Sequence, residues 1–132
     1  MTPPDLAIVL PTLNESGNLA PLIDRIGAAL RGIAWEVIVV DDDSADGTAD
    51  EARLLARRDG RVRVIQRMGR RGLSSAAIEG MLATAAPHVA VMDADHQHDP
   101  SLLPAMLAAV RGGADVAVAS RFAPGGSVAD WA

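Results

Sequence analysis

Residues 37–48 read Val-Ile-Val-Val-Asp-Asp-Asp-Ser-Ala-Asp-Gly-Thr, an apolar run that ends abruptly in three aspartates. A short β-branched run that is bounded by polar and turn residues is typical of a buried strand. The alanine-rich segment 48–58 follows, with its charged residues spaced as on the outer face of a helix. This stretch therefore predicts a strand, a polar loop and a helix, and the rest of the chain repeats that order.

Other apolar runs have the same character, so the predicted strands are 6–10, 37–40, 62–65, 89–92 and 116–119. Segments with apolar residues at helical spacing alternate with them, and the predicted helices cover 19–30, 48–58, 77–85 and 102–110. Alternating strands and helices indicate an α/β fold with a mostly parallel sheet flanked by helices.

The helix ends carry their own signals. Gly32 is placed to stop the first helix, and Pro87 ends the third. Asp99 is expected to cap the fourth helix, with Pro100 at its first position. The third helix is expected to bury an apolar stripe made of Ala77, Ile78, Met81, Leu82 and Ala85.

The composition narrows the class of protein. Of the 132 residues, 49% are hydrophobic and 22% are charged, which excludes a wholly disordered chain. Aromatic residues make up only 2% and the net charge is −5, so a nucleic acid is not an expected partner. There is no cysteine, and hence no disulfide or thiolate metal site. Because no apolar stretch approaches about 20 residues and no basic leader is present, we expect a cytoplasmic chain without a membrane segment.

Polar residues gather where four of the predicted strands end, at 12–15, 41–43, 93–95 and 120–121. Ligands bind to open α/β sheets outside the carboxyl ends of the strands. Parallel strands present these ends at one edge of the sheet, so the four polar segments are expected to converge there. Neither a G-x-G-x-x-G sequence nor a P-loop is present, so the site is not predicted to be of either kind.

Asp93, Asp95 and Gln97 alternate just after an apolar run. In an extended segment this spacing places all three side chains on one side. Two carboxylates and an amide carbonyl form an oxygen-only set, which suits Mg²⁺ or Mn²⁺ together with substrate phosphates. The alternative is a solvated acidic turn that leads into the next helix. His96 and His98 fall on the opposite side, where packing or capping is favoured over metal binding.

Asp41, Asp42 and Asp43 concentrate negative charge at the end of a neighbouring strand. Like charges at a partly buried site repel, so donors, a cation or a ligand are expected to compensate them. Asp42 is the best candidate to accept a hydrogen bond from a base or a ribose. For Asp43 and Ser44, a cap of the following turn is an equal alternative.

Arginines accompany this acidic edge at Arg67, Arg70, Arg71 and Arg121. The planar guanidinium group suits the recognition of phosphate. Arg70 and Arg71 have the alternative of being solvated loop residues. Arg121 follows a predicted buried strand directly, which makes it the stronger candidate for phosphate recognition.

Five motifs occur together in the order and spacing of one known family: Leu10-Pro-Thr-Leu-Asn-Glu15, Val39-Val-Asp-Asp-Asp-Ser-Ala-Asp-Gly-Thr48, Gly72-Leu-Ser-Ser-Ala76, Met92-Asp-Ala-Asp-His-Gln-His98 and Ser120-Arg-Phe-Ala-Pro-Gly-Gly126. The chain resembles the GT-A fold glycosyltransferases of family 2, most closely the dolichol-phosphate (polyprenol-phosphate) mannosyltransferase branch. The resemblance implies a GT-A, Rossmann-like sheet. The chain ends soon after the fifth predicted strand, so we interpret residues 1–132 as the nucleotide-sugar-binding part of a longer catalytic domain.

The resemblance also implies roles for individual positions. The residues that match nucleotide-sugar-binding positions are Pro11, Leu13, Glu15, Val40, Asp42, Asp93, Ala94, Asp95, Gln97 and Arg121. Among them, Asp93, Asp95 and Gln97 match positions that place Mg²⁺ or Mn²⁺ on the donor diphosphate. Arg121 matches an arginine that handles phosphate near the reacting centre, so Arg121 and Asp95 are the expected catalytic residues. Leu13 stands where the family usually has an aromatic residue, which removes stacking on the base.

The activity that the resemblance implies is metal-dependent, inverting transfer of a hexose to a polyprenyl or dolichyl phosphate. Mannose from GDP-mannose is the favoured donor, and a UDP-hexose is the alternative. The full-length protein is expected at the inner face of a membrane. Because the family's basic and membrane-interacting segments beyond the fifth strand have no counterpart here, we expect this chain to bind donor and metal but to transfer sugar poorly by itself.

Two other classes of function compete with this one. A nucleotide-sugar-binding module would keep the site without catalysis. A sugar-1-phosphate nucleotidyltransferase shares the layered fold, but it would need a glycine- and arginine-rich loop after the first strand. Residues 11–15 do not form such a loop.

Overall fold

The computed structural model of the chain describes residues 3–95 and 98–117. Its strands are β1 (Leu6–Thr12), β2 (Trp35–Asp41), β3 (Val62–Gln66) and β4 (His88–Val91). Its helices are α1 (Leu19–Ala29), α2 (Thr48–Arg58), α3 (Leu73–Leu82) and α4 (Leu103–Arg111), and the 3₁₀ turn η1 (Pro100–Leu102) leads into α4. The predicted alternation of strands and helices is confirmed for residues 6–111, although α3 begins and ends earlier than the predicted 77–85 and does not extend to Pro87.

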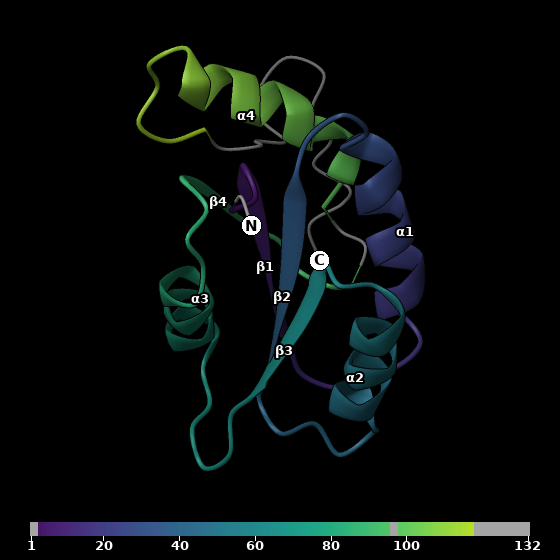
Figure 1. The fold of residues 1–132 in the computed structure, drawn as a ribbon. Coiled ribbons are helices and arrows are strands. Elements are labelled where there is room, and N and C mark those ends of the chain that lie inside the picture. Colours follow the sequence, from purple (N-terminus) through teal and green to yellow (C-terminus); the bar gives the residue numbers. More distant parts are fainter. Residues whose placement is uncertain (1–2, 96–97, 118–132) are drawn as a thin grey trace.

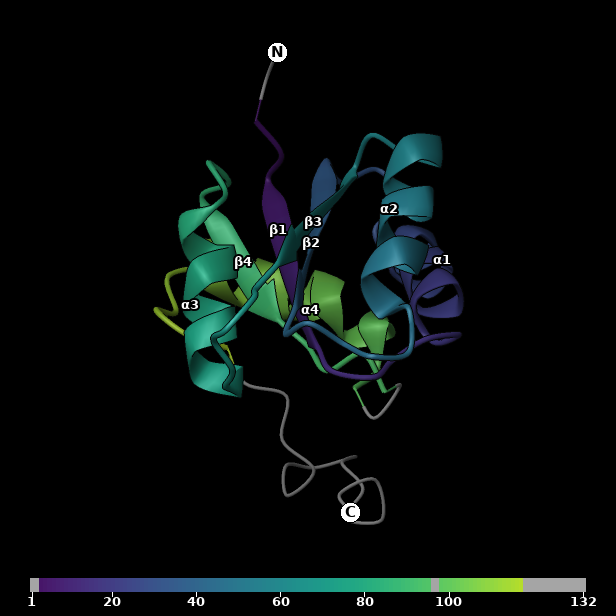
Figure 2. The same ribbon diagram turned by 90° about the horizontal axis from the view of Figure 1, so that it is seen from below.

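The strands pair in parallel, in the order β3-β2-β1-β4. In this sheet Leu6 of β1 is paired with Trp35 of β2 and with His88 of β4. Every residue of β1 is buried, as expected for a strand that is covered on both faces. The carboxyl ends of the strands lie at one edge of the sheet, which is at the bottom of Figure 1 and faces the viewer in Figure 2.

Helices cover both faces of the sheet (Figure 1). α1 and α2 lie on one face, over a core that includes Ile8 and Val39, and α4 adds Leu103 to the same core. α3 lies on the opposite face, against a smaller core that includes Val9 and Val40. The two cores draw on alternate residues of β1 and β2 because successive side chains of a strand point to opposite faces.

The buried face of α3 differs from the predicted one. Ala76 and Gly80 lie against the sheet. The exposed residues of the predicted stripe are Ile78, Met81, Leu82 and Ala85. α3 approaches the strands so closely that a Cβ on Gly80 would lie 2.3 Å from Cγ1 of Val9. The predicted stripe followed the large apolar side chains, and it was wrong because this close contact admits only small residues.

The sequence predicts a fifth strand over 116–119, of which only Val116 and Ala117 lie among the described residues. Neither is in a strand, and Val116 is 74% exposed. A strand persists where its backbone groups have partners, and the pairings in the described part of the chain include neither residue. For these two residues the prediction is wrong, while residues 118–119 lie outside the described ones.

The predicted cap before the fourth helix is confirmed. The backbone N–H of Ser101 donates to Oδ1 of Asp99 at 3.0 Å, and Pro100 is the first residue of the turn. This hydrogen bond, with a smaller contribution from the guanidinium of Arg25 at 3.6 Å, lowers the pKa of Asp99 below its ordinary value of 3.8. The first turn is 3₁₀, and the α-helix begins at Leu103.

The helices are short. α1 and α2 have 11 residues each, whereas a membrane span needs about 20. Within residues 3–95 and 98–117, no helix combines the length and the apolar character required to cross a membrane.

Candidate functional site

A pocket of about 350 Å³ opens at the carboxyl edge of the sheet, where the segments after β1, β2 and β4 meet the start of α3. Its lining residues are Pro11, Thr12, Leu13, Glu15, Asp42, Arg71, Gly72, Leu73, Asp93, Ala94 and Asp95. The predicted convergence of polar strand ends is confirmed for the first, second and fourth strands. The remaining polar segment, 120–121, lies outside the described residues.

The loops after β1 and β2 are joined by successive backbone N–H groups. Those of residues 14, 15, 16 and 17 donate in turn to Ser44 Oγ at 2.8 Å, Thr48 Oγ1 at 3.0 Å, Asp46 Oδ2 at 3.0 Å and Glu51 Oε2 at 2.7 Å. Asn14 adopts a left-handed conformation with φ 55°, which asparagine tolerates better than most residues. These bonds hold Leu13 and Glu15 at the pocket.

The turn before α2 is closed by the side chain of Asp46. Asp46 Oδ1 accepts the backbone N–H of Thr48 at 3.1 Å and also its hydroxyl. The bond from the Thr48 hydroxyl is the main cause that lowers the pKa of Asp46 below 3.8. Asp43, at φ 57°, accepts instead from Nε2 of Gln66 at 2.8 Å. Asp46 thus holds this turn, for which Asp43 and Ser44 had been the candidates.

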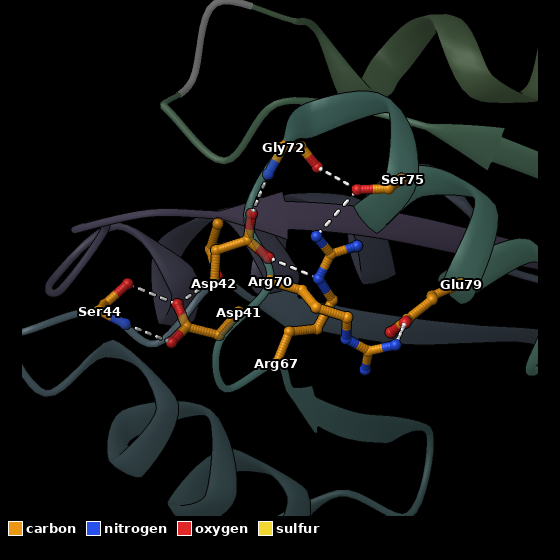
Figure 3. Close-up of polar contacts among 9 residues, drawn as sticks. Asp41, Asp42, Ser44, Arg67, Arg70, Gly72, Ser75 and Glu79 are labelled. Carbon is orange, nitrogen blue, oxygen red and sulfur yellow. Dashed lines mark hydrogen bonds and ion pairs between the residues drawn. The ribbon is translucent and has the colours of Figure 1, made fainter.

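Asp41 is completely buried and joins the ends of β1 and β2. Its Oδ1 accepts the hydroxyl of Thr12 at 2.7 Å and that of Ser44 at 2.6 Å. Its Oδ2 accepts the backbone N–H of Ser44 at 2.9 Å (Figure 3). Both carboxylate oxygens are engaged inside the protein, so Asp41 has a structural role and does not face a ligand.

The side chain of Asp42 faces the pocket, and its negative charge is compensated by the buried guanidinium of Arg67. Its Oδ2 accepts the backbone N–H of Gly72 at 2.9 Å, and its Oδ1 lies 2.9 Å from Nε of Arg67 (Figure 3). The second contact is an ion pair without hydrogen-bond geometry. The side chain of Arg67 is 1% exposed and that of Asp42 is 10% exposed. For Asp42, the expectation that something compensates the acidic cluster is confirmed.

Asp93, Ala94 and Asp95 line the part of the pocket that follows β4. β4 ends at Val91, and Ala94 and Asp95 form a turn, so the segment is not extended as the predicted alternation requires. The side chain of Asp93 is 41% exposed and Asp95 is exposed, so both carboxylates are accessible to a ligand.

Two accessible carboxylates fit a hard divalent cation that completes its coordination with water and phosphate oxygens. In the described part of the chain, no three His, Cys, Asp or Glu side chains are grouped so as to hold a metal by themselves. A cation at Asp93 and Asp95 would complete its coordination with oxygens from outside these two carboxylates. His96 and Gln97 lie outside the described residues. Nδ1 of His98 accepts the backbone N–H of Asp93 at 3.2 Å, which agrees with the capping role favoured for this histidine.

Most of the residues assigned through the resemblance line this pocket, namely Pro11, Leu13, Glu15, Asp42, Asp93, Ala94 and Asp95. Val40 does not, because its side chain is completely buried in the core beneath α3. Gln97 and Arg121 lie outside the described residues.

Sequence reasoning missed part of the pocket wall. The sequence leaves two roles open for Arg71, a phosphate ligand or a solvated loop residue. Arg71 lines the pocket, which favours the role of phosphate ligand. Gly72 and Leu73 were not assigned to the site. The motif at residues 72–76 was the signal that could have found them.

The sequence places the chain among known proteins. The family model described as "Glycosyl transferase family 2" matches residues 7–132. This chain belongs to glycosyl transferase family 2. The resemblance inferred from the five motifs is confirmed.

The names of two curated relatives of this family 2 chain include a polyprenol. The dolichol-phosphate mannosyltransferase of Pyrococcus furiosus is 42% identical over 126 residues, which cover 96% of this chain and 36% of the relative. The polyprenol monophosphomannose synthase of Mycolicibacterium smegmatis is 39% identical over 128 residues, which cover 94% of this chain and 48% of the relative. The chain thus spans less than half the length of either relative.

Two solved structures resemble the family 2 chain. The mannosyltransferase PcManGT from Pyrobaculum calidifontis, in complex with GDP-Man and Mn²⁺, matches 72% of this chain and 28% of its own, with a TM-score of 0.58 and 26% identity. Glucosyl-3-phosphoglycerate synthase from Mycobacterium tuberculosis, in complex with Mn²⁺, UDP and phosphoglyceric acid, matches 81% of this chain and 39% of its own, with a TM-score of 0.64 and 28% identity. The predicted GT-A fold is confirmed.

Proposed function

We propose that this chain is the donor-binding part of a polyprenyl-phosphate mannosyltransferase. The reaction is inverting transfer of a hexose, by preference mannose, from a nucleotide-diphosphate sugar to a polyprenyl or dolichyl phosphate. The observation that carries the proposal is one pocket in which Asp42, paired with a buried arginine, faces the same space as the accessible carboxylates of Asp93 and Asp95. The names of the relatives support the acceptor class.

The charge of the pocket supports a divalent cation as part of the site. Besides Asp42, which is paired with Arg67, the charged residues of the lining are three carboxylates and one arginine, namely Glu15, Asp93, Asp95 and Arg71. A nucleoside diphosphate is itself anionic, so surplus carboxylates repel it unless a cation lies between them. We assign that place to Mg²⁺ or Mn²⁺ on Asp93 and Asp95, with Gln97 as the expected third ligand. Mn²⁺ in two related structures supports this assignment.

The remaining walls of the pocket fit a nucleoside. Asp42 can accept hydrogen bonds from ribose hydroxyls or from the N–H groups of a base. Leu13 and Leu73 are 47% and 62% exposed, so they offer apolar surface for a base to cover, whereas Pro11 lines the pocket but is buried. Leucine in place of an aromatic residue supplies apolar contact without stacking.

The chemistry requires little of the protein beyond binding and electrostatics. When bound, the cation stabilises the charge that develops on the diphosphate leaving group. The acceptor phosphate is ionised at neutral pH, so its attack on the sugar needs no general base. Arg71 adds positive charge at the pocket wall, and Arg121 is assigned the same task near the reacting centre. Asp95 contributes to catalysis by holding the cation.

The donor nucleotide and the chemistry of this piece each have an alternative. The names of the relatives favour mannose, and the complex of PcManGT with GDP-Man favours GDP-mannose, while the structure with UDP supports a UDP-hexose. A module that binds the donor without transferring sugar is the other alternative, since the chain spans 36% and 48% of two curated relatives. Because the acceptor is a lipid, we place the full-length protein at the inner face of a membrane.

Calorimetry of this chain with GDP and UDP, with and without Mn²⁺, tests the proposal. We expect GDP to bind in a Mn²⁺-dependent manner. Asp95→Ala should lower the affinity for GDP by about 10-fold or more, because it removes a carboxylate that coordinates the metal ion. The control is Asp50→Ala, which removes an exposed carboxylate on α2. Tighter binding of UDP would select the UDP-hexose alternative. If neither nucleotide binds in a metal-dependent way, the donor-site proposal is wrong.

A transfer assay with GDP-mannose and a polyprenyl phosphate separates catalysis from binding. We expect this chain to bind the donor and to turn over much more slowly than a protein of the relatives' full length. Turnover at the rate of the longer protein would contradict that expectation. Binding with no detectable transfer would support the binding-module alternative.

A further inference from the structure

We propose that Arg67 is a positioning residue that sets the affinity of this site for the nucleoside half of its ligand. The inference rests on the function proposed above, in which Asp42 accepts hydrogen bonds from the nucleoside. Arg67 does not line the pocket, and its side chain is 1% exposed. It acts through two parts of the pocket wall that it holds, the carboxylate of Asp42 and the backbone at Gly72.

Arg67 joins three segments of the chain. Its backbone N–H donates to the carbonyl oxygen of Asp41 at 2.7 Å, which fixes the residue beside the end of β2. Its Nε pairs with Oδ1 of Asp42 at 2.9 Å, and its Nη2 donates to Oγ of Ser75 at 2.9 Å. The guanidinium therefore bridges the end of β2 and the first turn of α3 (Figure 3).

These contacts close into a ring. Oδ2 of Asp42 accepts the backbone N–H of Gly72 at 2.9 Å, and the hydroxyl of Ser75 donates to the carbonyl oxygen of Gly72 at 3.2 Å. Because Arg67 contacts both Asp42 and Ser75, the four residues restrain one another (Figure 3). Gly72 has φ 138°, a conformation that needs glycine, and it lines the pocket beside Asp42. The ring thus sets the orientation of the carboxylate and the position of the loop together.

The stability of the fold does not account for an arginine at this place. Burying a guanidinium is costly, and apolar residues of similar volume often replace a buried ion pair without loss of stability. Nη1 of Arg67 is buried without a hydrogen-bond partner, which adds to that cost. What the arginine supplies, and an apolar residue cannot, is a fixed direction for the Asp42 carboxylate.

The test compares two ligands that share the diphosphate. Each variant is titrated with GDP and with pyrophosphate, both in the presence of Mn²⁺. Arg67→Met removes the positive charge and the N–H donors of this side chain. We expect the affinity for GDP to fall by about 10-fold, which corresponds to the loss of one hydrogen bond between the nucleoside and the charged Asp42. Pyrophosphate affinity should change by less than about twofold, since Arg67 acts at the nucleoside end. Arg67→Lys, which keeps the charge, should restore part of the GDP affinity.

Two further variants control for indirect effects. Arg63→Met removes an arginine of β3, the strand that Arg67 directly follows; its guanidinium pairs with Glu36, and the substitution should change neither affinity. In a chain that already carries Asp42→Asn, Arg67→Met should have little further effect on GDP, because the residue through which it acts is gone. If circular dichroism shows that Arg67→Met does not fold, Arg67→Lys replaces it in this double-mutant cycle.

The outcomes separate this inference from the proposed function. Equal losses of GDP and pyrophosphate affinity in the Arg67 variant, or losses that add to those of Asp42→Asn, would show a general structural role and overturn the inference alone. If the unsubstituted chain binds no nucleotide in the presence of Mn²⁺, the proposed function fails, and the role of Arg67 fails with it.

Discussion

A Cβ atom on Gly80 would lie 2.3 Å from Cγ1 of Val9 and 3.2 Å from Cγ2 of Val40. α3 therefore rests on β1 and β2 at a position that has no room for a side chain. Both valines are completely buried and β-branched, so they cannot turn away easily. The same helix begins at Leu73, which lines the pocket, so the close contact at Gly80 also helps to place the pocket wall.

Gly80→Ala should lower the free energy of unfolding by roughly 1–3 kcal/mol through overpacking. This loss is expected although alanine is favoured over glycine in a helix by about 1 kcal/mol. Urea denaturation measures the difference. The matched control is Gly60→Ala, because a Cβ at Gly60 meets nothing within 4 Å, and it should be neutral or slightly stabilising. Equal stabilities of the two variants would contradict the packing argument.

Periodicity predicts a helix well where the helix buries large apolar residues. The stripe of α1 is of this kind, and its buried members are Leu19, Leu22, Ile23 and Ile26. α2 was predicted with its observed bounds, 48–58, from its alanines and the spacing of its charged residues, although it buries only small residues, Thr48, Ala49 and Ala52. In α3 the buried residues are Ala76 and Gly80, and the large residues face outward. Hydrophobicity alone cannot show how near a helix comes to its sheet, so the buried face of α3 could not be predicted.

The sequence predicts the site residues that lie near the end of a strand, but it does not predict the contacts that form only when distant segments pack together. Asp42 directly follows β2 and Asp93 lies two residues after β4, and the carboxyl ends of parallel strands share an edge. The partner of Asp42 is Arg67, which is far from it in the sequence and comes beside it only because β2 and β3 pair in parallel. No spacing rule links the two residues. Asp42, Gly72 and Ser75 lie in two of the five motifs, but their connection through Arg67 could not be predicted from the sequence.

Asp41 and Asp42 are adjacent, but they should respond differently to substitution. Asp41→Ala removes the acceptor of the buried Thr12 hydroxyl and of two groups of the half-buried Ser44. Donors that are left without a partner cost free energy, and we expect a loss of roughly 3 kcal/mol in unfolding by urea. Asp50→Ala is the control, since its side chain is 85% exposed and its ion pair should contribute less than about 1 kcal/mol. A loss at Asp41 no larger than that at Asp50 would refute its structural role.

The cap at Asp99 should make stability depend on pH in acid. The pKa of Asp99 is lowered in the folded chain, so its charged form stabilises the fold at neutral pH. That stabilisation is present above the ordinary pKa of 3.8 and is lost as the pH falls through the lower folded value. Asp99→Ala should cost about 1 kcal/mol at pH 7, and the cost should shrink at the lowest pH at which the chain stays folded. A cost that is independent of pH over this range would contradict the assignment of the cap.

Substitutions of the neighbouring residues Arg71 and Arg70 distinguish a ligand contact from a surface ion pair. Arg71 lines the pocket, whereas Arg70 pairs with Glu79 at 2.6 Å and is not among the lining residues (Figure 3). Arg71→Met should weaken GDP by about 3- to 10-fold, because it removes positive charge from beside the phosphates, and guanosine should be affected much less. Arg70→Met should leave both affinities within about twofold, because an exposed ion pair contributes little.

Added salt should reduce the difference between GDP binding to the unsubstituted chain and to Arg71→Met, since the contact is electrostatic and open to solvent. Equal effects of Arg71→Met on GDP and on guanosine, measured by calorimetry, would show that Arg71 does not contact the phosphates.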